Sequence, residues 1–216
     1  SAIAIGEETI TDGAYALSMG YHTTASAPYS LAMGMSANSG LGFGGAAVTH
    51  FQDAGATHSI SIGTFATVTK TGTGSIAIGQ SNYTNYPANV LLGQSNKVSV
   101  IGEAYEPMQW EKYSYNVAVG QANLMSSDYS VALGMSNDIS GSRSIGIGYN
   151  NIVSGSDSLG LGNRSQISAS DFAIAIGREA TSSTDYSIAL GYKSIANKDN
   201  VSATGYGISI GSEARA

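Results

Sequence analysis

The stretch Ser75-Ile76-Ala77-Ile78-Gly79 decides the fold, because close copies of it recur along the whole chain of 216 residues. Two of the clearest copies are Ser130-Val131-Ala132-Leu133-Gly134 and Ser187-Ile188-Ala189-Leu190-Gly191. Fifteen copies can be counted, and 14 residues is the most frequent spacing between them. A short fixed period indicates a solenoid, in which each repeat forms one coil that stacks on the next. The copies close at Gly6, Gly20, Gly34, Gly44, Gly63, Gly79, Gly93, Gly102, Gly120, Gly134, Gly148, Gly162, Gly177, Gly191 and Gly211.

Large and small residues alternate within each copy. The residues one and three positions before the closing glycine are large and apolar, except Ser99, and the residue between them is usually Ala, Ser or Gly. Alternation with a period of two predicts a short strand, because a helix would need a period of about 3.6 residues. A second apolar element, such as Ile139 or Ile152-Val153, follows each glycine and is bracketed by turn residues. The sequence therefore predicts an all-β parallel solenoid with coils of about 14 residues and two short strands per coil.

The large residues and the small residues of each copy form two separate columns, which we expect to pack differently. We expect the large aliphatic side chains to face the inside of each coil. The column of Ala, Ser and Gly would then face outward and let the backbone of a sister chain approach closely. Because a two-stranded coil has a very narrow interior, we expect several chains to pack side by side in a closed symmetric oligomer.

The motif S-[IV]-A-[IL]-G at a spacing of 14 residues resembles the YadA-like head repeat of trimeric autotransporter adhesins, and similar repeats occur in bacteriophage tail fibres. The resemblance covers nearly the whole chain. It implies a left-handed parallel β-roll that assembles as a homotrimer without a cofactor, in an extracellular location on a virion or a bacterial surface. In the adhesin family, copies with a serine two residues after the glycine are tied to collagen binding, and residues 75–81 and 130–136 have this form.

Two long interruptions of the repeat are the most informative places for function. We expect one elongated domain over residues 1–216, with insertions at about 45–58 and 103–115. Loops inserted into a repeat scaffold tend to carry binding, and Trp and Tyr dominate binding hot spots. The alternative is that Trp110 fills a gap between coils or between chains. The candidate binding residues are His50 and Phe51 in the first insertion, and Tyr105, Trp110, Tyr113 and Tyr115 in the second.

Aromatic residues also recur five positions before the closing glycine. Stacking of the coils would align neighbouring members of this column into an aromatic ladder. A structural role is the favoured interpretation of the ladder, and a ligand-binding strip is the alternative. The members are Tyr15, Tyr29, His58, Tyr115, Tyr129, Phe172 and Tyr186.

The composition argues against several classes of function. Nine Lys and Arg against fifteen Asp and Glu give a net charge of −6, which disfavours nucleic acid and anionic lipid as partners. The chain has no cysteine, and no apolar run is long enough to cross a membrane. Residues 207–211 match the nucleophile pattern G-x-S-x-G, but Ser209 lies in the small-residue column and no helix-forming segment follows. His22, His50 and His58 are not spaced as zinc ligands, so we expect neither a catalytic residue nor a metal site.

These observations predict a non-enzymatic protein that attaches to cell surfaces. The irregular spacing, the aromatic insertions and the lack of an evident neck segment before Ala216 favour the receptor-binding head of a phage tail fibre. Its partner would be a glycan or protein of the bacterial surface. One alternative is the head of a bacterial autotransporter adhesin that binds host matrix such as collagen. Another is a structural spacer within a fibre.

Overall fold

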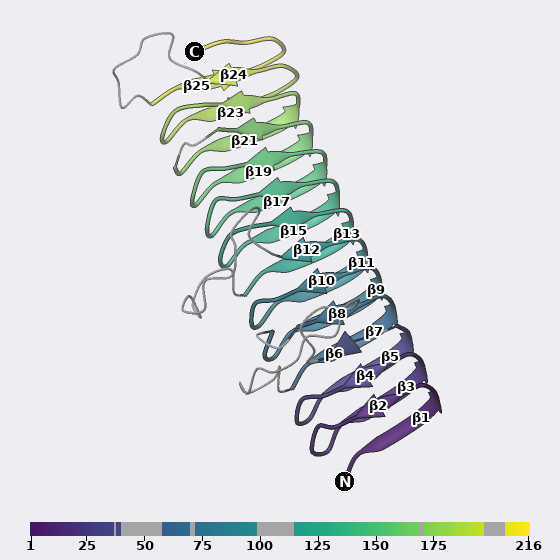
Figure 1. Cartoon of the computed structure of the whole chain (residues 1–216). Helices are drawn as coiled ribbons and strands as arrows, with labels where there is room; N and C mark the ends of the chain where they lie inside the picture. The colour runs from purple at the N-terminus through teal and green to yellow at the C-terminus, as the bar shows by residue number, and fades with distance from the viewer. Residues whose placement is uncertain (37, 40–57, 70–71, 99–114, 169–170, 197–205) are drawn as a thin grey trace. The chain divides into compact units, whose positions relative to one another are not determined.

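The computed structural model consists of β-strands and turns wherever it describes the chain (Figure 1). Strands of three or five residues alternate with strands of two residues. The chain divides into two compact units, residues 1–119 and 120–216, and each unit forms such an array of coils. A single domain over residues 1–216 stays a prediction. The described residues are 1–36, 38–39, 58–69, 72–98, 115–168, 171–196 and 206–216.

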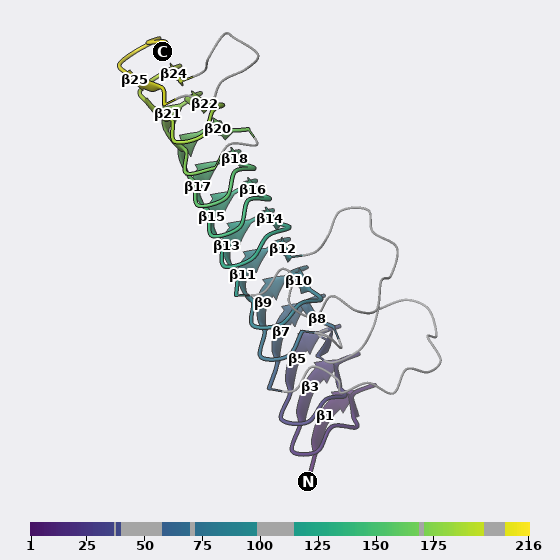
Figure 2. The same cartoon turned by 90° about the vertical axis from the view of Figure 1, so that its left-hand side faces the viewer.

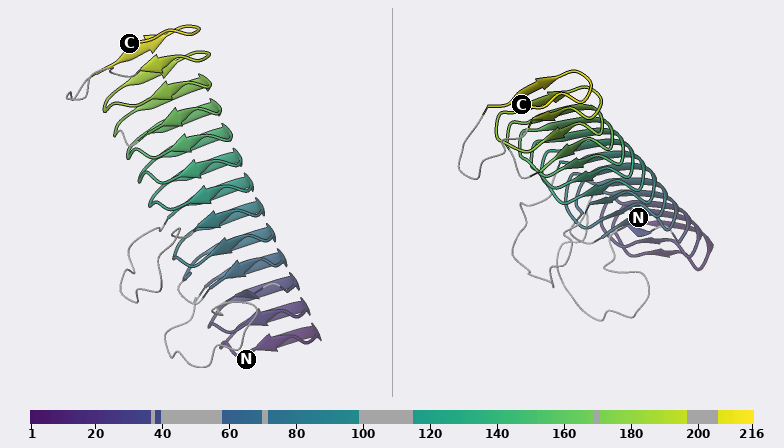
Figure 3. Two further views of the ribbon diagram at one scale, coloured as in Figure 1. Left: turned by 45° about the horizontal axis from the view of Figure 1, so that its top comes forward. Right: turned by 90° about the horizontal axis from the view of Figure 1, so that it is seen from above.

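The longer strands of each unit form a parallel sheet in which the strand order follows the chain (Figure 3). Each coil thus adds one strand to the sheet, as a solenoid requires. In the first unit the strands are β1 (Ile3–Glu7), β3 (Leu17–Tyr21), β5 (Leu31–Met35), β7 (Ile60–Thr64), β9 (Ile76–Gln80) and β11 (Val90–Gln94), and β13 (Val117–Gln121) contains the unit boundary. In the second unit they are β15 (Val131–Met135), β17 (Ile145–Tyr149), β19 (Leu159–Asn163), β21 (Ile174–Arg178), β23 (Ile188–Leu190) and β25 (Ile208–Ile210).

The two-residue strands form a second parallel sheet in each unit, on the opposite side of the coils (Figure 2). The predicted all-β parallel solenoid with two short strands per coil is therefore confirmed. In the first unit the short strands are β2 (Ile10–Thr11), β4 (Thr24–Ala25), β6 (Asn38–Ser39), β8 (Thr67–Val68), β10 (Tyr83–Thr84) and β12 (Lys97–Val98). In the second they are β14 (Leu124–Met125), β16 (Asp138–Ile139), β18 (Ile152–Val153), β20 (Gln166–Ile167), β22 (Thr181–Ser182) and β24 (Ile195–Ala196).

The closing glycines lie opposite one another in neighbouring long strands. Gly6 pairs with Gly20, and Gly79 pairs with Gly93. Gly79 has a φ of +118°, which side chains with a Cβ rarely adopt. A Cβ added at this position would also lie only 1.9 Å from the carbonyl oxygen of Gly93. The close approach of the coils therefore requires glycine.

Two of the fifteen predicted copies do not add a coil. The copies that close at Gly44 and Gly102 lie outside the described residues. β5 pairs directly with β7, and the backbone N–H of Val90 donates to the carbonyl of Asn116 at 2.8 Å. No strand therefore lies between these neighbouring coils, and the prediction of a coil at each copy is wrong.

The small-residue column faces the inside of the coil, which is the reverse of the prediction. Ala77 is fully buried and packs with Ala66 and Val68 in one apolar cluster. Where the column holds a glycine, a larger side chain of the short strand fills the space opposite. A Cβ added at Gly146, for example, would lie only 2.2 Å from Cδ1 of Ile139. In most coils the interior holds a small residue of the long strand against a larger residue of the short strand, whereas in β11 the inward residue is the fully buried Leu91. Each long strand therefore turns its middle residue, which is small in every described long strand except β11, inward and the two flanking large residues outward.

Buried asparagines connect consecutive coils inside the solenoid. Nδ2 of Asn137 donates to Oδ1 of Asn123 at 2.9 Å and to the backbone oxygens of Leu133 and Gly148 at 3.2 Å. Oδ1 of Asn137 accepts from the backbone N–H of Asn151 at 3.2 Å and from its Nδ2 at 2.8 Å. These bonds satisfy a buried amide. They also join the coils independently of the hydrogen bonds within the two sheets.

We predict that Gly79→Ala lowers the free energy of unfolding by at least about 3 kcal/mol, because the new methyl group would overlap the sheet-bound backbone of Gly93. Gly74→Ala is the matched control. Gly74 has a φ of +71°, and among the described residues no atom lies within 4 Å of an added Cβ. Its cost is about 1 kcal/mol, from the left-handed backbone alone. Chemical denaturation compares the two variants, and equal losses would contradict the packing explanation.

Candidate binding surfaces

The outer face of the long-strand sheets carries large aliphatic side chains at two positions per strand. These are the first and third residues of each long strand, which share a side because successive strand residues alternate. Ile78 is 37% exposed and Ile145 is 38% exposed, so the chain itself covers this face only in part. We call this surface the aliphatic face. Its residues are Ile3, Ile5, Leu17, Met19, Leu31, Met33, Ile60, Ile62, Ile76, Ile78, Val90, Leu92, Val117 and Val119 in the first unit, and Val131, Leu133, Ile145, Ile147, Leu159, Leu161, Ile174, Ile176, Ile188, Leu190, Ile208 and Ile210 in the second.

The aliphatic face has the composition of an interface core. Contiguous apolar patches larger than a few hundred Å² are rare on monomeric soluble proteins. None of the residues of the aliphatic face is charged, and depletion of charge is typical of the centre of an interface. The expectation that the small-residue column receives sister chains is wrong, since Ala77 and Ala132 are fully buried. The surface suited to packing is therefore the aliphatic face.

The outer face of the short-strand sheets differs, because it mixes polar and apolar side chains. Thr67, Tyr83 and Lys97 follow one another there in the first unit. In the second unit Asp138 pairs with Leu124 on one side and Ile152 on the other. Burial raises the pKa of the Asp138 carboxyl above its ordinary value. This face is therefore less suited to packing against an apolar partner.

The aromatic ladder is present in the first unit. The rings of Tyr15 and Tyr29 stack with centroids 5.4 Å apart and planes 11° from parallel. Tyr29 stacks in turn on His58, with centroids 5.1 Å apart and planes 9° from parallel. All three residues have a left-handed backbone with φ near +57°, at the end of the turn that precedes a long strand. The predicted ladder of Tyr15, Tyr29 and His58 is therefore confirmed.

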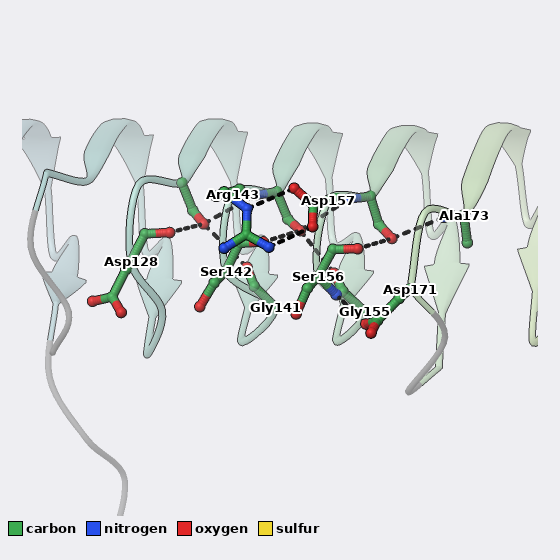
Figure 4. Close-up of polar contacts among 12 residues, drawn as sticks. Asp128, Gly141, Ser142, Arg143, Gly155, Ser156, Asp157, Asp171 and Ala173 are labelled. Atoms are coloured by element: carbon green, nitrogen blue, oxygen red, sulfur yellow. Dashed lines mark hydrogen bonds and ion pairs between the residues drawn. The ribbon is translucent and has the colours of Figure 1, made fainter. Parts of the chain in front are cut away.

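In the second unit the same turn position combines charged and aromatic residues. Arg143 and Asp157, in consecutive coils, form a bidentate ion pair with Nε–Oδ1 at 2.7 Å and Nη2–Oδ2 at 2.5 Å (Figure 4). The hydrogen bond from Arg143 lowers the pKa of the Asp157 carboxyl. Further along, Phe172 and Tyr186 stack with centroids 5.0 Å apart and planes 4° from parallel.

The candidate residues from the two insertions are described only in part. Tyr115 is 58% exposed and has the left-handed backbone of the turn position. His50, Phe51, Tyr105, Trp110 and Tyr113 lie outside the described residues, and their role in binding stays a prediction. Both interruptions connect a short strand to the next long strand, as the described β6, β7, β12 and β13 show. They therefore enter the coil at the same turn as the aromatic ladder, which alignment of the repeats could have revealed.

Among the described residues, the serine and histidine considered as candidates for chemistry have other contacts. The Ser209 side chain is buried, and its Oγ lies 2.9 Å from Oγ of Ser194 inside the solenoid, which supports a structural serine. His22 contacts Glu8 on the surface. In the described part of the chain no group of three or more His, Cys, Asp or Glu is placed to hold a metal ion. Nor do the described residues contain a helix that could cross a membrane.

Comparison with known families agrees with this geometry. The family model of the YadA head domain repeat matches residues 12–37, 54–82, 140–165, 170–194 and 185–207, which together span more than half of the chain. The chain belongs to the YadA head family. The resemblance seen in the sequence is thereby confirmed. The comparison with curated proteins gives no match. YadA heads are surface-exposed adhesin repeats, which supports an extracellular or surface location and points to a non-enzymatic function.

The half-buried carboxyl of Asp138 predicts a pH-dependent effect on stability. Its pKa is higher in the folded than in the unfolded protein, so ionisation of this group opposes folding above the unfolded value of about 3.9. Asp138→Asn should therefore raise the melting temperature at neutral pH. The gain should shrink as the pH falls through the folded pKa and vanish once the carboxyl is protonated in both states. A gain that is independent of pH would contradict this explanation.

Proposed function

We propose that this chain is the attachment head of a homotrimeric surface fibre and that it has no enzymatic activity. The observation that carries the proposal is the aliphatic face, which repeats two uncharged aliphatic residues in every coil of both units. If the aliphatic face were exposed to water, it would promote aggregation. Packed in an assembly, it would supply an apolar core that the narrow interior of the single coil cannot contain.

A second copy of the same chain is the occupant that best fits the aliphatic face. Neighbouring coils of a solenoid are about 4.8 Å apart, so a partner should present apolar residues at the same period. A second copy of the chain has the same period, because it has the same coils. Closed rotational symmetry would cover the face on every copy, whereas an open arrangement would leave one face exposed. The number three comes from the YadA head family, which forms trimeric fibres.

The turn that carries the aromatic ladder and both insertions is the part of the coil that we assign to attachment. It lies outside the aliphatic face, so assembly through that face would leave it accessible. Exposed aromatic residues such as Tyr115 supply contact area at a low cost in conformational entropy. Its partner would be a glycan or a protein of a cell surface.

We assign the fibre to a bacteriophage tail. The support is the interruption of the coils between β5 and β7 and between β11 and β13, with aromatic residues such as Trp110 in the second insertion. The alternative is a bacterial adhesin head that binds matrix such as collagen through residues 75–81 and 130–136. Ser75 and Ser130 are buried and hydrogen-bonded to backbone oxygens, which weakens that alternative. A third candidate is a fibre spacer without a receptor site.

Assembly through the aliphatic face can be tested by sedimentation. We expect the wild-type protein to have a mass three times the 22.0 kDa of one chain. Ile147→Lys combined with Leu161→Lys places two charges in the aliphatic face, and burial of unpaired charges should dissociate the trimer. Leu124→Lys combined with Ile152→Lys, on the short-strand face, is the control and should leave the mass unchanged. A monomeric wild type, or equal effects of the two variants, would refute the proposal.

Attachment can be tested by removing the second insertion. Deletion of residues 102–114 shortens the spacing from Gly93 to Gly120 to the regular 14 residues and keeps Tyr115. We expect the deleted protein to stay trimeric and to lose its binding to intact bacterial cells. Leu124→Lys combined with Ile152→Lys, on the short-strand face and outside this turn, is the control and should leave binding to cells unchanged. Unchanged binding of the deleted protein to cells would contradict the role of the second insertion. If the wild-type protein bound neither cells nor collagen, the spacer would be favoured, and binding to collagen-coated plates without binding to cells would favour the adhesin.

A further inference from the structure

The turn column of the second unit ends in a surface that combines aromatic rings with carboxylates. Asp171 precedes Phe172 in one coil, Asp185 precedes Tyr186 in the next, and Tyr206 occupies the same position in the last. We call these five residues the acidic aromatic strip. Phe172 is 49% exposed and Tyr186 is 51% exposed, although their rings stack on each other.

The geometry of the rings leaves part of each face accessible. Phe172 and Tyr186 are nearly parallel, but their centroids are 5.0 Å apart, which is the separation of an offset stack. Tyr206 is tilted by 40° from Tyr186 with centroids 5.4 Å apart, so it does not cover the ring of Tyr186 completely. The exposed parts of the ring faces carry the negative potential of the π-system. They are therefore suited to a cation.

The two carboxylates are held in fixed positions beside these rings. Oδ1 of Asp185 accepts from the backbone N–H of Asp171 at 2.9 Å, and Oδ1 of Asp171 accepts from the backbone N–H of Ser156 at 2.9 Å. Each aspartate is thus oriented by the coil that precedes it. Each carboxylate belongs to the residue directly before an exposed aromatic residue, so it adds a negative charge to the same turn.

Two tyrosines elsewhere in the chain, the half-buried Tyr83 and the exposed Tyr192, already have a cation of their own. Nζ of Lys97 lies 5.9 Å from the centroid of the Tyr83 ring, and Lys193 and Arg178 lie within 5.7 Å of the Tyr192 ring. Within the described ranges, no lysine or arginine lies over a ring of the acidic aromatic strip. The preceding coils show how a cation fits this turn, because the Arg143 guanidinium spans two coils to reach Asp157.

The first unit offers an internal comparison. Tyr15 and Tyr29 occupy the same turn position and stack in the same way. They are preceded by Ala14 and Pro28, so no carboxylate accompanies the rings. The pairing of aspartate with an aromatic residue is therefore a property of the second unit and not a requirement of the ladder.

We propose that the acidic aromatic strip binds lysine or arginine side chains of a basic segment on a partner protein. The rings would contribute cation–π contacts and Asp171 and Asp185 would contribute charge. The net charge of −6 would favour the approach of a basic partner. This inference deepens the attachment function proposed above and rests on it, since it names the chemistry of one partner.

The test measures binding of a fluorescent decalysine peptide to the full chain by anisotropy at low and at raised salt. Tyr186→Asn removes a ring while an asparagine tolerates the left-handed backbone. Asp171→Asn with Asp185→Asn removes two charges and keeps both oxygen acceptors. The matched controls in the first unit are Tyr29→Asn, and Glu7→Gln with Asp12→Asn, which removes the same net charge from exposed positions.

We expect each strip variant to weaken peptide binding by about fivefold to tenfold at low salt, and each control to change it by less than about twofold. Equal losses in strip variants and controls would overturn the proposal, because binding would then follow net charge alone. Binding of a neutral oligosaccharide that is lost in Tyr186→Asn and kept in Asp171→Asn with Asp185→Asn would overturn it in favour of a glycan. The mass of every protein is measured by sedimentation, so a failure of the trimer is distinguished from a failure of the strip.

Discussion

The structure depends on the narrow interior of its coils. The two strands of one coil lie so close that a small residue such as Gly146 is needed opposite Ile139. Since each long strand alternates small and large residues, burying the small column forces the large aliphatic residues outward. The coil that results is well packed inside and apolar outside. This outward aliphatic face is the basis of the assembly that we propose.

The same narrowness explains why so much of the interior is polar. A coil that cannot bury much aliphatic volume gains little from the hydrophobic effect, and amide and hydroxyl groups take its place. The asparagine ladder around Asn137 satisfies its own donors and acceptors across consecutive coils. Because each bond joins equivalent residues of neighbouring coils, a slip of the register would leave several buried polar groups unpaired. Polar burial thus adds specificity to the alignment of the strands.

Because the register of the coils is strict, the residue type at one position of the repeat determines the chemistry of a strip on the surface. Any residue type that repeats at the same position of successive coils becomes a strip along the unit. At one turn the chain uses this to build the stack of Tyr15, Tyr29 and His58 in the first unit. In the second unit the same turn carries an ion pair and then aspartates beside aromatic rings. The scaffold stays constant while the strip changes its chemistry.

The sequence alone determined the strands, their parallel order and the alignment of the turn column, because these follow from period and spacing. It also supplied the family, through the motif that ends at glycines such as Gly79. It could not determine which side of each strand faces inward, since alternation with a period of two looks the same from both sides. Only the tertiary structure decided this, because packing of the two strands of a coil against each other buries the middle residue of the long strand, such as Ala77 or Leu91, and leaves Ile78 on the outside. It likewise decided that the copies at Gly44 and Gly102 add no coil, since pairing of β5 with β7 depends on contacts that a local motif does not contain.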